Sequence, residues 1–122
     1  MKEPSLYPEI RKALEGLGMA VTKVPGSPYN MGIPDFICTH RGRAVHIEVK
    51  LQRKGKASVP TLLQIDHLDR HRRAGAFAAV LYFHEPSKRW IGFPGNGAEY
   101  SAGRKQLQDL FDSMMRGGDT SV

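Results

Sequence analysis

The chain has 122 residues, of which 40% are hydrophobic and 25% charged, a composition typical of one globular domain with a buried core. A formal net charge of +6 favours a polyanionic partner, although a basic protein without such a partner can have the same composition. The single cysteine, Cys38, excludes an internal disulfide and a cysteine-based zinc site. No apolar run is long enough to span a membrane, and the N-terminal segment lacks the apolar stretch of a signal peptide.

The apolar pattern predicts alternating helices and strands. Leu6, Ile10 and Leu14 recur at helical spacing, and Pro8 fits the first turn of a helix, where its missing N–H costs nothing. The predicted elements are a helix at 5–17, strands at 19–24, 33–39 and 44–51, a helix at 60–74 with Leu62, Ile65 and Leu68 facing inward, strands at 76–83 and 90–93, and a helix at 104–116. This order predicts an α/β fold with a central mixed sheet flanked by helices, in one domain over residues 1–116 with a flexible tail at 117–122.

The hairpin around Arg41-Gly42 carries three charged residues on one face. A turn centred there sets Asp35 directly opposite Glu48, with Cβ atoms about 4.5–5.5 Å apart, where two carboxylates repel each other. A divalent cation such as Mg²⁺ would remove this repulsion, and Lys50, two residues after Glu48, points to the same face. This arrangement predicts metal-assisted phosphodiester cleavage. The alternative is a surface hairpin in which Glu48 pairs with Lys50 and Asp35 caps a turn.

The order Pro34-Asp35, then Glu48-Val49-Lys50 on the next strand, resembles the motif of the PD-(D/E)XK nuclease superfamily. The segment KVPGSPYNMGIPDFICTHRGRAVHIEVK is similar to the core of archaeal-type (Hjc-like) Holliday junction resolvases and of phage VRR-NUC nucleases. The segment SVPTLLQIDHLDRHRRAGAFAAVLYF is similar to the same families and to RecU resolvases. The resemblance implies a restriction-endonuclease-like fold.

The resemblance also implies a role for each matching residue. Asp35 and Glu48 would bind the metal together with the backbone carbonyl of Val49, and Lys50 would position water or stabilise charge on the phosphate. Gln64 would support the site from the following helix, although it can also be an ordinary exposed residue. Ser27 would reach the scissile phosphate from its loop, although it can also be a plain turn serine.

These families also place a glutamate on the first helix, about three turns before the glycine that ends it. Counting back from Gly18 leads to Tyr7 rather than to a glutamate. We assign the role to Glu9, in the first turn of the predicted helix, and keep Glu3 as the alternative if the helix begins earlier.

Two further groups of residues have a possible role in binding. His67 and His71 are spaced i, i+4, as in a metal-binding pair. Because no third ligand follows at a spacing typical of a metal site, they are interpreted as surface or phosphate-facing residues. Basic residues gather in the hairpin turn, in the loop after it and at the end of the second helix, and we expect them to contact DNA. They are Arg41, Arg43, Arg53, Lys54, Lys56, Arg70, Arg72 and Arg73.

From these observations we expect an Mg²⁺-dependent endodeoxyribonuclease, in which Mn²⁺ can substitute, acting as a Holliday junction resolvase on branched DNA. The alternatives are a VRR-NUC or restriction-like nuclease of flaps, nicks or duplex DNA, and an inactive DNA-binding module, against which the intact Asp35, Glu48 and Lys50 argue. We expect a cytoplasmic protein of a prokaryotic, archaeal or phage-infected cell, with no membrane association. Paired cuts predict a homodimer. Candidate contacts, each of which could instead be internal core, are Phe111, Met114, Met115, Trp90 and Phe93.

Overall fold

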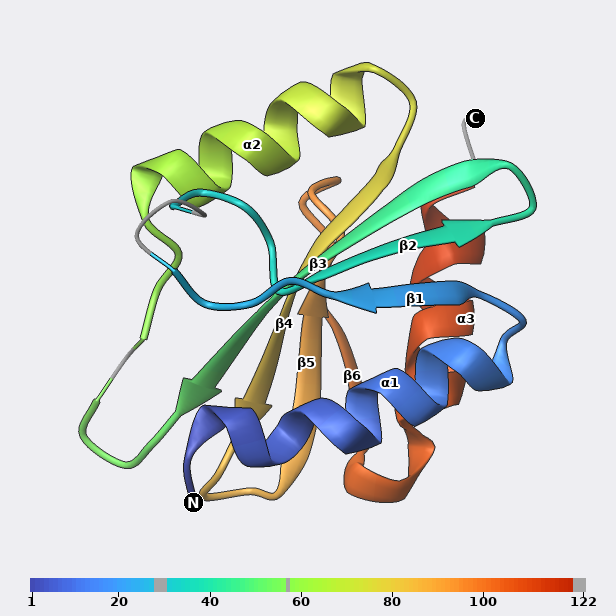
Figure 1. Cartoon of the computed structure of the whole chain (residues 1–122). Helices are drawn as coiled ribbons and strands as arrows, with labels where there is room; N and C mark the ends of the chain where they lie inside the picture. Colours follow the sequence, from blue (N-terminus) through green and yellow to red (C-terminus); the bar gives the residue numbers. More distant parts are fainter. Residues whose placement is uncertain (28–30, 57, 120–122) are drawn as a thin grey trace.

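The computed structural model describes residues 1–27, 31–56 and 58–119 as a six-stranded mixed sheet flanked by helices (Figure 1). The strands lie in the sheet in chain order, and only the β3–β4 pair is parallel. They are β1 (Ala20–Lys23), β2 (Phe36–His40), β3 (Arg43–Gln52), β4 (Phe77–His84), β5 (Arg89–Phe93) and β6 (Tyr100–Gly103). The helical elements are η1 (Glu3–Leu6), α1 (Tyr7–Gly16), α2 (Leu62–Arg73), η3 (Arg104–Gln106) and α3 (Leu107–Asp119). The predicted α/β fold with a mixed sheet is confirmed.

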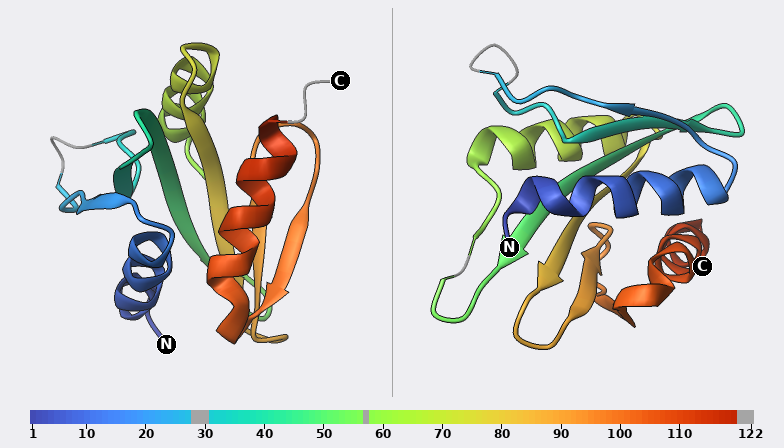
Figure 2. Two further views of the ribbon diagram at one scale, coloured as in Figure 1. Left: turned by 90° about the vertical axis from the view of Figure 1, so that its right-hand side faces the viewer. Right: turned by 60° about the horizontal axis from the view of Figure 1, so that its bottom comes forward.

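The helices are divided unequally between the two faces of the sheet (Figure 2). α1 and α3 pack side by side on one face, and the apolar core lies between them and the sheet. α2 alone covers the other face as the crossover between the parallel strands β3 and β4, and its buried residues are only His67 and Leu68. The second face therefore has little apolar packing, and polar side chains of β3 can lie beneath α2.

The hairpin of β2 and β3 has the predicted register. Phe36 pairs with Ile47 and Cys38 with Val45. Arg41 and Gly42 both have positive φ, 51° and 78°, as a two-residue type I′ turn requires. The twist of this turn matches the twist of the strands. The turn thereby sets the register that brings the two carboxylates together.

The rotation of α2 differs from the prediction. Leu62 is 85% exposed and Ile65 41% exposed, so of the three residues predicted to face inward only Leu68 does. The reason lies at the helix start, where Thr61 and Gln64 form a capping box. The sheet-facing positions are instead Gln64, His67, Leu68 and His71, which follow helical spacing but are mostly polar.

Three other elements differ from the predicted boundaries. The first helical segment begins earlier, with the 3₁₀ turn η1 at Glu3, and the last helix runs on to Asp119 instead of ending at Arg116. The strand β6 was not predicted, since its four residues YSAG have no apolar alternation and are extended through pairing with β5. The remainder of the expected tail, 120–122, lies outside the described residues. None of the helices in the described ranges is long and apolar enough to cross a bilayer.

Most residues considered for a dimer interface belong to the core of the single chain. Trp90, Phe111 and Met114 are fully buried, packed between the sheet and the helices. Met115 is partly buried against the same core, and Phe93 is exposed at the end of β5. Trp90, Phe111 and Met114 are therefore not available for contact with a second copy.

Candidate active site

The carboxylates of Asp35 and Glu48 meet where β2 begins alongside β3. Asp35 lies one residue before β2, and its Oδ2 accepts a hydrogen bond of 2.8 Å from the backbone N–H of Val49. The N–H and C=O of one strand residue point to the same edge, so the Val49 carbonyl also lies on the Asp35 side of β3. The hairpin register thus brings together the two predicted carboxylates and the Val49 backbone.

Glu48 is a buried acid with incomplete hydrogen bonding. Its side chain is only 4% exposed, and its Oε2 has no hydrogen-bond donor among the described residues. Burial first, and then the adjacent Asp35 carboxylate, raise the pKa of Glu48 from 4.5 to about 9, although the Lys50 ammonium acts in the opposite direction. Lys50 Nζ lies 3.9 Å from Glu48 Oε1. The metal-free site therefore favours a proton on Glu48, because burial and the Asp35 charge outweigh the effect of Lys50.

Gln64 connects the carboxylates to α2. Its Nε2 donates to Glu48 Oε1 at 2.9 Å, while its Oε1 accepts from the Thr61 N–H at 2.8 Å. The Thr61 hydroxyl in turn accepts from the Gln64 N–H, which completes the capping box. The amide is thus held at both ends, and the start of α2 is placed at the site by the same side chain that contacts Glu48.

The first helical segment contributes Glu3 and Tyr7 to the site, not Glu9. The Tyr7 hydroxyl lies 3.1 Å from Glu3 Oε1 and 3.2 Å from Asp35 Oδ1. Burial and the Asp35 charge raise the pKa of Glu3. Glu9 points elsewhere and forms an ion pair with Arg104 at 3.1 Å. The alternative, Glu3, therefore lies at the site and Glu9 does not, because the helical segment starts earlier than predicted; the role of Glu3 stays a prediction.

Lys23 is a second cation at the site that the sequence analysis did not identify. Its Nζ lies 3.9 Å from Asp35 Oδ1 and 4.4 Å from the centre of the Tyr7 ring. The sequence feature that points to Lys23 is its position at the end of the first strand. This strand pairs with β2, so that Lys23 lies opposite Phe36, the residue that follows Asp35. Lys23 at the end of β1 thus lies near Asp35, and Lys50 on β3 lies near Glu48.

An open pocket of about 220 Å³ leads to the carboxylates. It is lined by residues 24–27 and 31–35 together with Glu48 and Gln64, so Ser27 lies on its wall. The residues between these two segments, 28–30, are outside the described ranges. Gly32 has a φ of 84°, and a Cβ there would stand 3.0 Å from the Cβ of Leu63, so this loop approaches α2 closely. Another hollow, of about 450 Å³ near the hairpin turn, shares no lining residue with this pocket.

The predicted DNA-contacting residues form two groups at the two ends of β3. Arg43 donates to the Gly75 carbonyl at 3.0 Å, which joins the hairpin turn to the end of α2. This group comprises Arg41, Arg43, Arg70, Arg72 and Arg73. The second group is the loop after β3, with Arg53, Lys54 and Lys56. Glu48 lies on β3 between the two groups.

Some of these arginines are engaged within the chain. Arg72 donates to the Ala78 carbonyl at 2.6 Å and pairs with Asp69 at 2.8 Å, so it holds the end of α2 on β4. Arg70 pairs with the exposed Asp66 at 2.9 Å, and Arg53 donates to the Met1 carbonyl. Lys54 and Lys56 are exposed in the loop after β3.

The fold is that of known nucleases. The chain is similar in structure to Hjc, a Holliday junction resolvase of the archaeal hyperthermophile Archaeoglobus fulgidus, with a TM-score of 0.54 and 24% identity over 92% of this chain and 97% of that one. It is also similar to a VRR_NUC domain, with a TM-score of 0.54 and 22% identity over 90% of this chain and 94% of that one. No protein-family model and no curated protein matches the sequence.

Both neighbours have the restriction-endonuclease-like fold, and this chain has the same fold. The resemblance to Hjc-like resolvases and VRR-NUC nucleases that the sequence predicted is confirmed at the level of the fold.

Proposed function

We propose that the chain is a divalent-metal-dependent endodeoxyribonuclease that cuts branched DNA, with the four-way junction as its main substrate. The observation that carries the proposal is the buried Oε2 of Glu48, which has no hydrogen-bond donor in the described part of the chain and lies beside the Asp35 carboxylate. Two buried carboxylates so close repel each other, and a divalent cation between them would remove this repulsion. Hard carboxylate and carbonyl oxygens suit Mg²⁺, with Mn²⁺ able to substitute.

Asp35, Glu48 and the Val49 carbonyl are the groups that would hold the ion. When bound, it would polarise the phosphate and lower the pKa of a water molecule. The Val49 N–H and the Tyr7 hydroxyl orient Asp35, and the Gln64 amide orients Glu48.

The two lysines supply positive charge where phosphate negative charge increases during cleavage. Lys50 Nζ is 3.9 Å from Glu48, and Lys23 Nζ is 3.9 Å from Asp35. Lys50 stabilises the developing charge or holds the attacking water, and Ser27 can contact the phosphate from the pocket wall. Lys50→Ala is expected to lower the single-turnover rate far more than the affinity, whereas a loss of affinity at an unchanged rate would make Lys50 only a phosphate anchor.

The two basic groups support a DNA path along β3. The strand has ten residues, so at about 3.3 Å per residue its ends are roughly 30 Å apart. This distance corresponds to about nine nucleotides of a duplex strand, with the carboxylates near the middle. A DNA arm lying on this face would contact both basic groups and present one phosphate to the pocket.

The test is parallel cleavage of a four-way junction, a flap and a linear duplex of equal length in Mg²⁺, Mn²⁺ and EDTA. We expect paired cuts in the junction only with metal, and no cleavage by Asp35→Asn or Glu48→Gln, both of which should keep DNA affinity. Cleavage of the flap with the junction left intact would favour the VRR-NUC-like alternative. Wild-type-like cleavage by either variant would contradict the site.

A further inference from the structure

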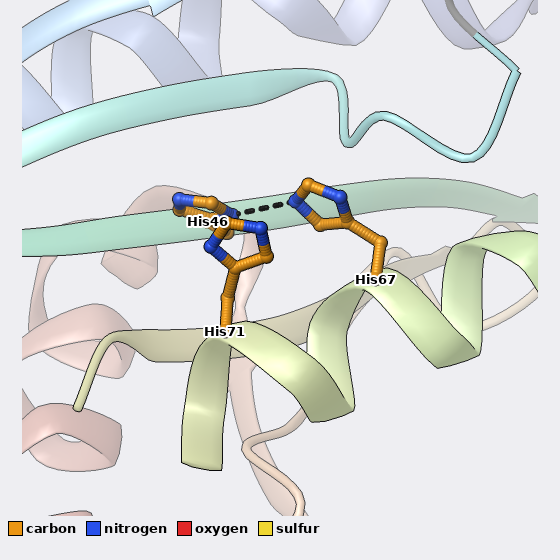
Figure 3. A group of neighbouring side chains, drawn as sticks. All are labelled: His46, His67 and His71. Carbon is orange, nitrogen blue, oxygen red and sulfur yellow. Dashed lines mark hydrogen bonds between the residues drawn. The ribbon is translucent and has the colours of Figure 1, made fainter. Parts of the chain in front are cut away.

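Three histidines converge between β3 and α2, outside the carboxylate site (Figure 3). His46 comes from β3, and His67 and His71 lie one turn apart on α2. One ring nitrogen of each residue lies within 4.8 Å of the corresponding nitrogens of the other two. His46 and His67 are buried, and His71 is partly exposed. The interpretation of His67 and His71 as surface or phosphate-facing residues is wrong for His67, which is buried. Their third partner, His46, could not be identified from spacing because it is distant in the chain.

The spacing of these nitrogens fits one tetrahedral ion. Zn–N bonds of about 2.0–2.1 Å at tetrahedral angles place two ligand nitrogens about 3.3 Å apart. Here His46 Nδ1 and His67 Nε2 are 2.9 Å apart, and no pair in the cluster exceeds 4.8 Å. A bound ion would bring the three nitrogens to this separation by rotation of the histidine side chains. The ring centroids are 4.1–5.1 Å apart and the ring planes are inclined by 22–36°, so the three side chains occupy the same small space.

An ion could reach this cluster from solvent. His71 lines a surface hollow of about 330 Å³ formed with residues 41–44 and 74–76. Water in this hollow can supply a fourth ligand, as in zinc sites with three protein ligands. The donors are three neutral nitrogens, a softer set than the carboxylates of the other site, so the two sites should prefer different metals.

The cluster also occupies the part of the structure where apolar packing is weakest. The only other buried side chain of α2 is Leu68, so the histidines make up much of the contact between this helix and the sheet. His46 precedes Glu48 by two residues on the same face of β3, and His67 follows Gln64 by one helical turn. An ion bound here would fix the spacing of α2 and β3 at which the Gln64 amide reaches Glu48.

We propose that His46, His67 and His71 form a Zn²⁺ site that fastens α2 to the sheet and thereby positions Gln64 against Glu48. The ion is structural and distinct from the catalytic cation, and its binding does not depend on the nuclease activity proposed above. Without metal, the hydrogen bond between His46 and His67 and the stacking of the rings hold the cluster together.

The test is a Zn²⁺ titration of the full chain, stripped of metal, against a chromophoric zinc indicator in the presence of millimolar Mg²⁺. We expect one Zn²⁺ per chain and a rise of several degrees in melting temperature. Removing even an outer partner of a metal ligand weakens binding about 10–100-fold, so His67→Ala and His71→Ala should weaken it at least as much. The matched control is His84→Ala, because His84 bonds to Ser87 at the far end of β4. It should bind Zn²⁺ as the unaltered chain does.

Zn²⁺ binding by a carboxylate variant and the absorption of bound Co²⁺ test the location of the ion. Asp35→Asn should still bind one Zn²⁺, and loss of binding in that variant would place the ion at the carboxylates and overturn the proposal. Co²⁺ bound to the unaltered chain should give the intense visible absorption of a tetrahedral ion, and His71→Ala, which removes the one partly exposed ligand, should abolish it. Equal Zn²⁺ affinity of His71→Ala and His84→Ala, or a stoichiometry well below one, would also overturn it.

Discussion

The amide of Gln64 donates to Glu48 at 2.9 Å while its own oxygen caps the first turn of α2. One side chain thus both starts a helix and orients a buried acid. The consequence is that α2 cannot rotate about its axis without breaking this contact. The same restraint turns Leu62 and Ile65 to solvent and directs the histidines toward the sheet.

This double role can be separated by two substitutions of Gln64. Gln64→Ala removes both the cap and the contact with Glu48, and we expect it to lower the free energy of unfolding by about 1–2 kcal/mol. Gln64→Glu retains a side chain that can complete the capping box but replaces the donor to Glu48 with an acceptor. Helix capping should survive in this variant, whereas cleavage should fall as strongly as in Gln64→Ala. Chemical denaturation and single-turnover cleavage measure the two effects, and normal cleavage by Gln64→Glu would show that the contact with Glu48 is dispensable.

A matched pair of glutamates tests which residue of the first helical segment serves the site. Glu3 shares the Tyr7 hydroxyl with Asp35, so Glu3→Gln is expected to slow cleavage about 10–100-fold, as loss of an outer partner of a metal ligand does. Glu9→Gln removes only a part-exposed ion pair with Arg104, worth about 0–1 kcal/mol, and should cleave normally. The opposite order of the two rates would restore Glu9 as the functional residue.

The raised pKa of Glu48 predicts how the stability of the metal-free protein depends on pH. The folded state keeps a proton on Glu48 up to about pH 9, whereas the unfolded chain loses it near pH 4.5. Since the folded state binds more protons between these values, the free energy of unfolding should fall as pH rises, by at most about 1.4 kcal/mol per pH unit. Glu48→Gln should remove this slope and be increasingly more stable than the unaltered chain toward pH 9. Urea titrations at pH 6, 7, 8 and 9 in EDTA would reveal it, and parallel curves for the two proteins would contradict it.

The sequence predicted the hairpin correctly because its register depends on local rules. The turn at Arg41-Gly42 and the alternation of apolar residues together place Asp35 opposite Glu48, and both features are visible within twenty residues. The PD-(D/E)XK pattern then identified the fold, which the structural neighbours confirm.

What the sequence did not predict depends on long-range packing. Glu3 and Lys23 reach Asp35 through the placement of η1 and β1, which no local pattern specifies. The inward face of α2 is polar, so apolar periodicity selected the wrong side, and Leu62 was placed inside although it is exposed. His46 joins the helical histidines only through the β3–α2 contact.

The two basic groups allow a paired test of the DNA path. Neutralising Arg53, Lys54 and Lys56 together should weaken binding to every DNA and reduce the slope of log K against log salt, by up to about 0.9 for each phosphate that the protein no longer neutralises. Neutralising Arg41 and Arg73 at the other end of β3 should have the same kind of effect if the DNA spans both ends. Fluorescence anisotropy at several salt concentrations measures the slopes. If the salt slope changes for only one of the two basic groups, the DNA contacts only that end of β3. If it changes for neither, the DNA binds to another surface.

The homodimer remains a prediction, and the fold narrows the choice of residues that could form its interface. A four-way junction is resolved by two cuts in symmetry-related strands, and each chain carries one set of Asp35, Glu48 and Lys50. A twofold dimer is the simplest arrangement that holds two such sites at a fixed separation. Because Trp90, Phe111 and Met114 are fully enclosed in the core of one chain, replacing Phe111 should unfold the chain rather than separate two copies.

We therefore expect a homodimer at micromolar concentration, formed through surfaces other than those three side chains. Light scattering coupled to size exclusion, with and without junction DNA, gives the mass directly. Mixing the unaltered chain with Asp35→Asn offers a functional control. In an obligate pair, mixed dimers should nick the junction in one strand and leave it unresolved, so resolution should fall faster than the fraction of unaltered chains. A monomer in both conditions, or resolution that falls only in proportion to that fraction, would argue against paired cutting and favour a nuclease of flaps or nicks.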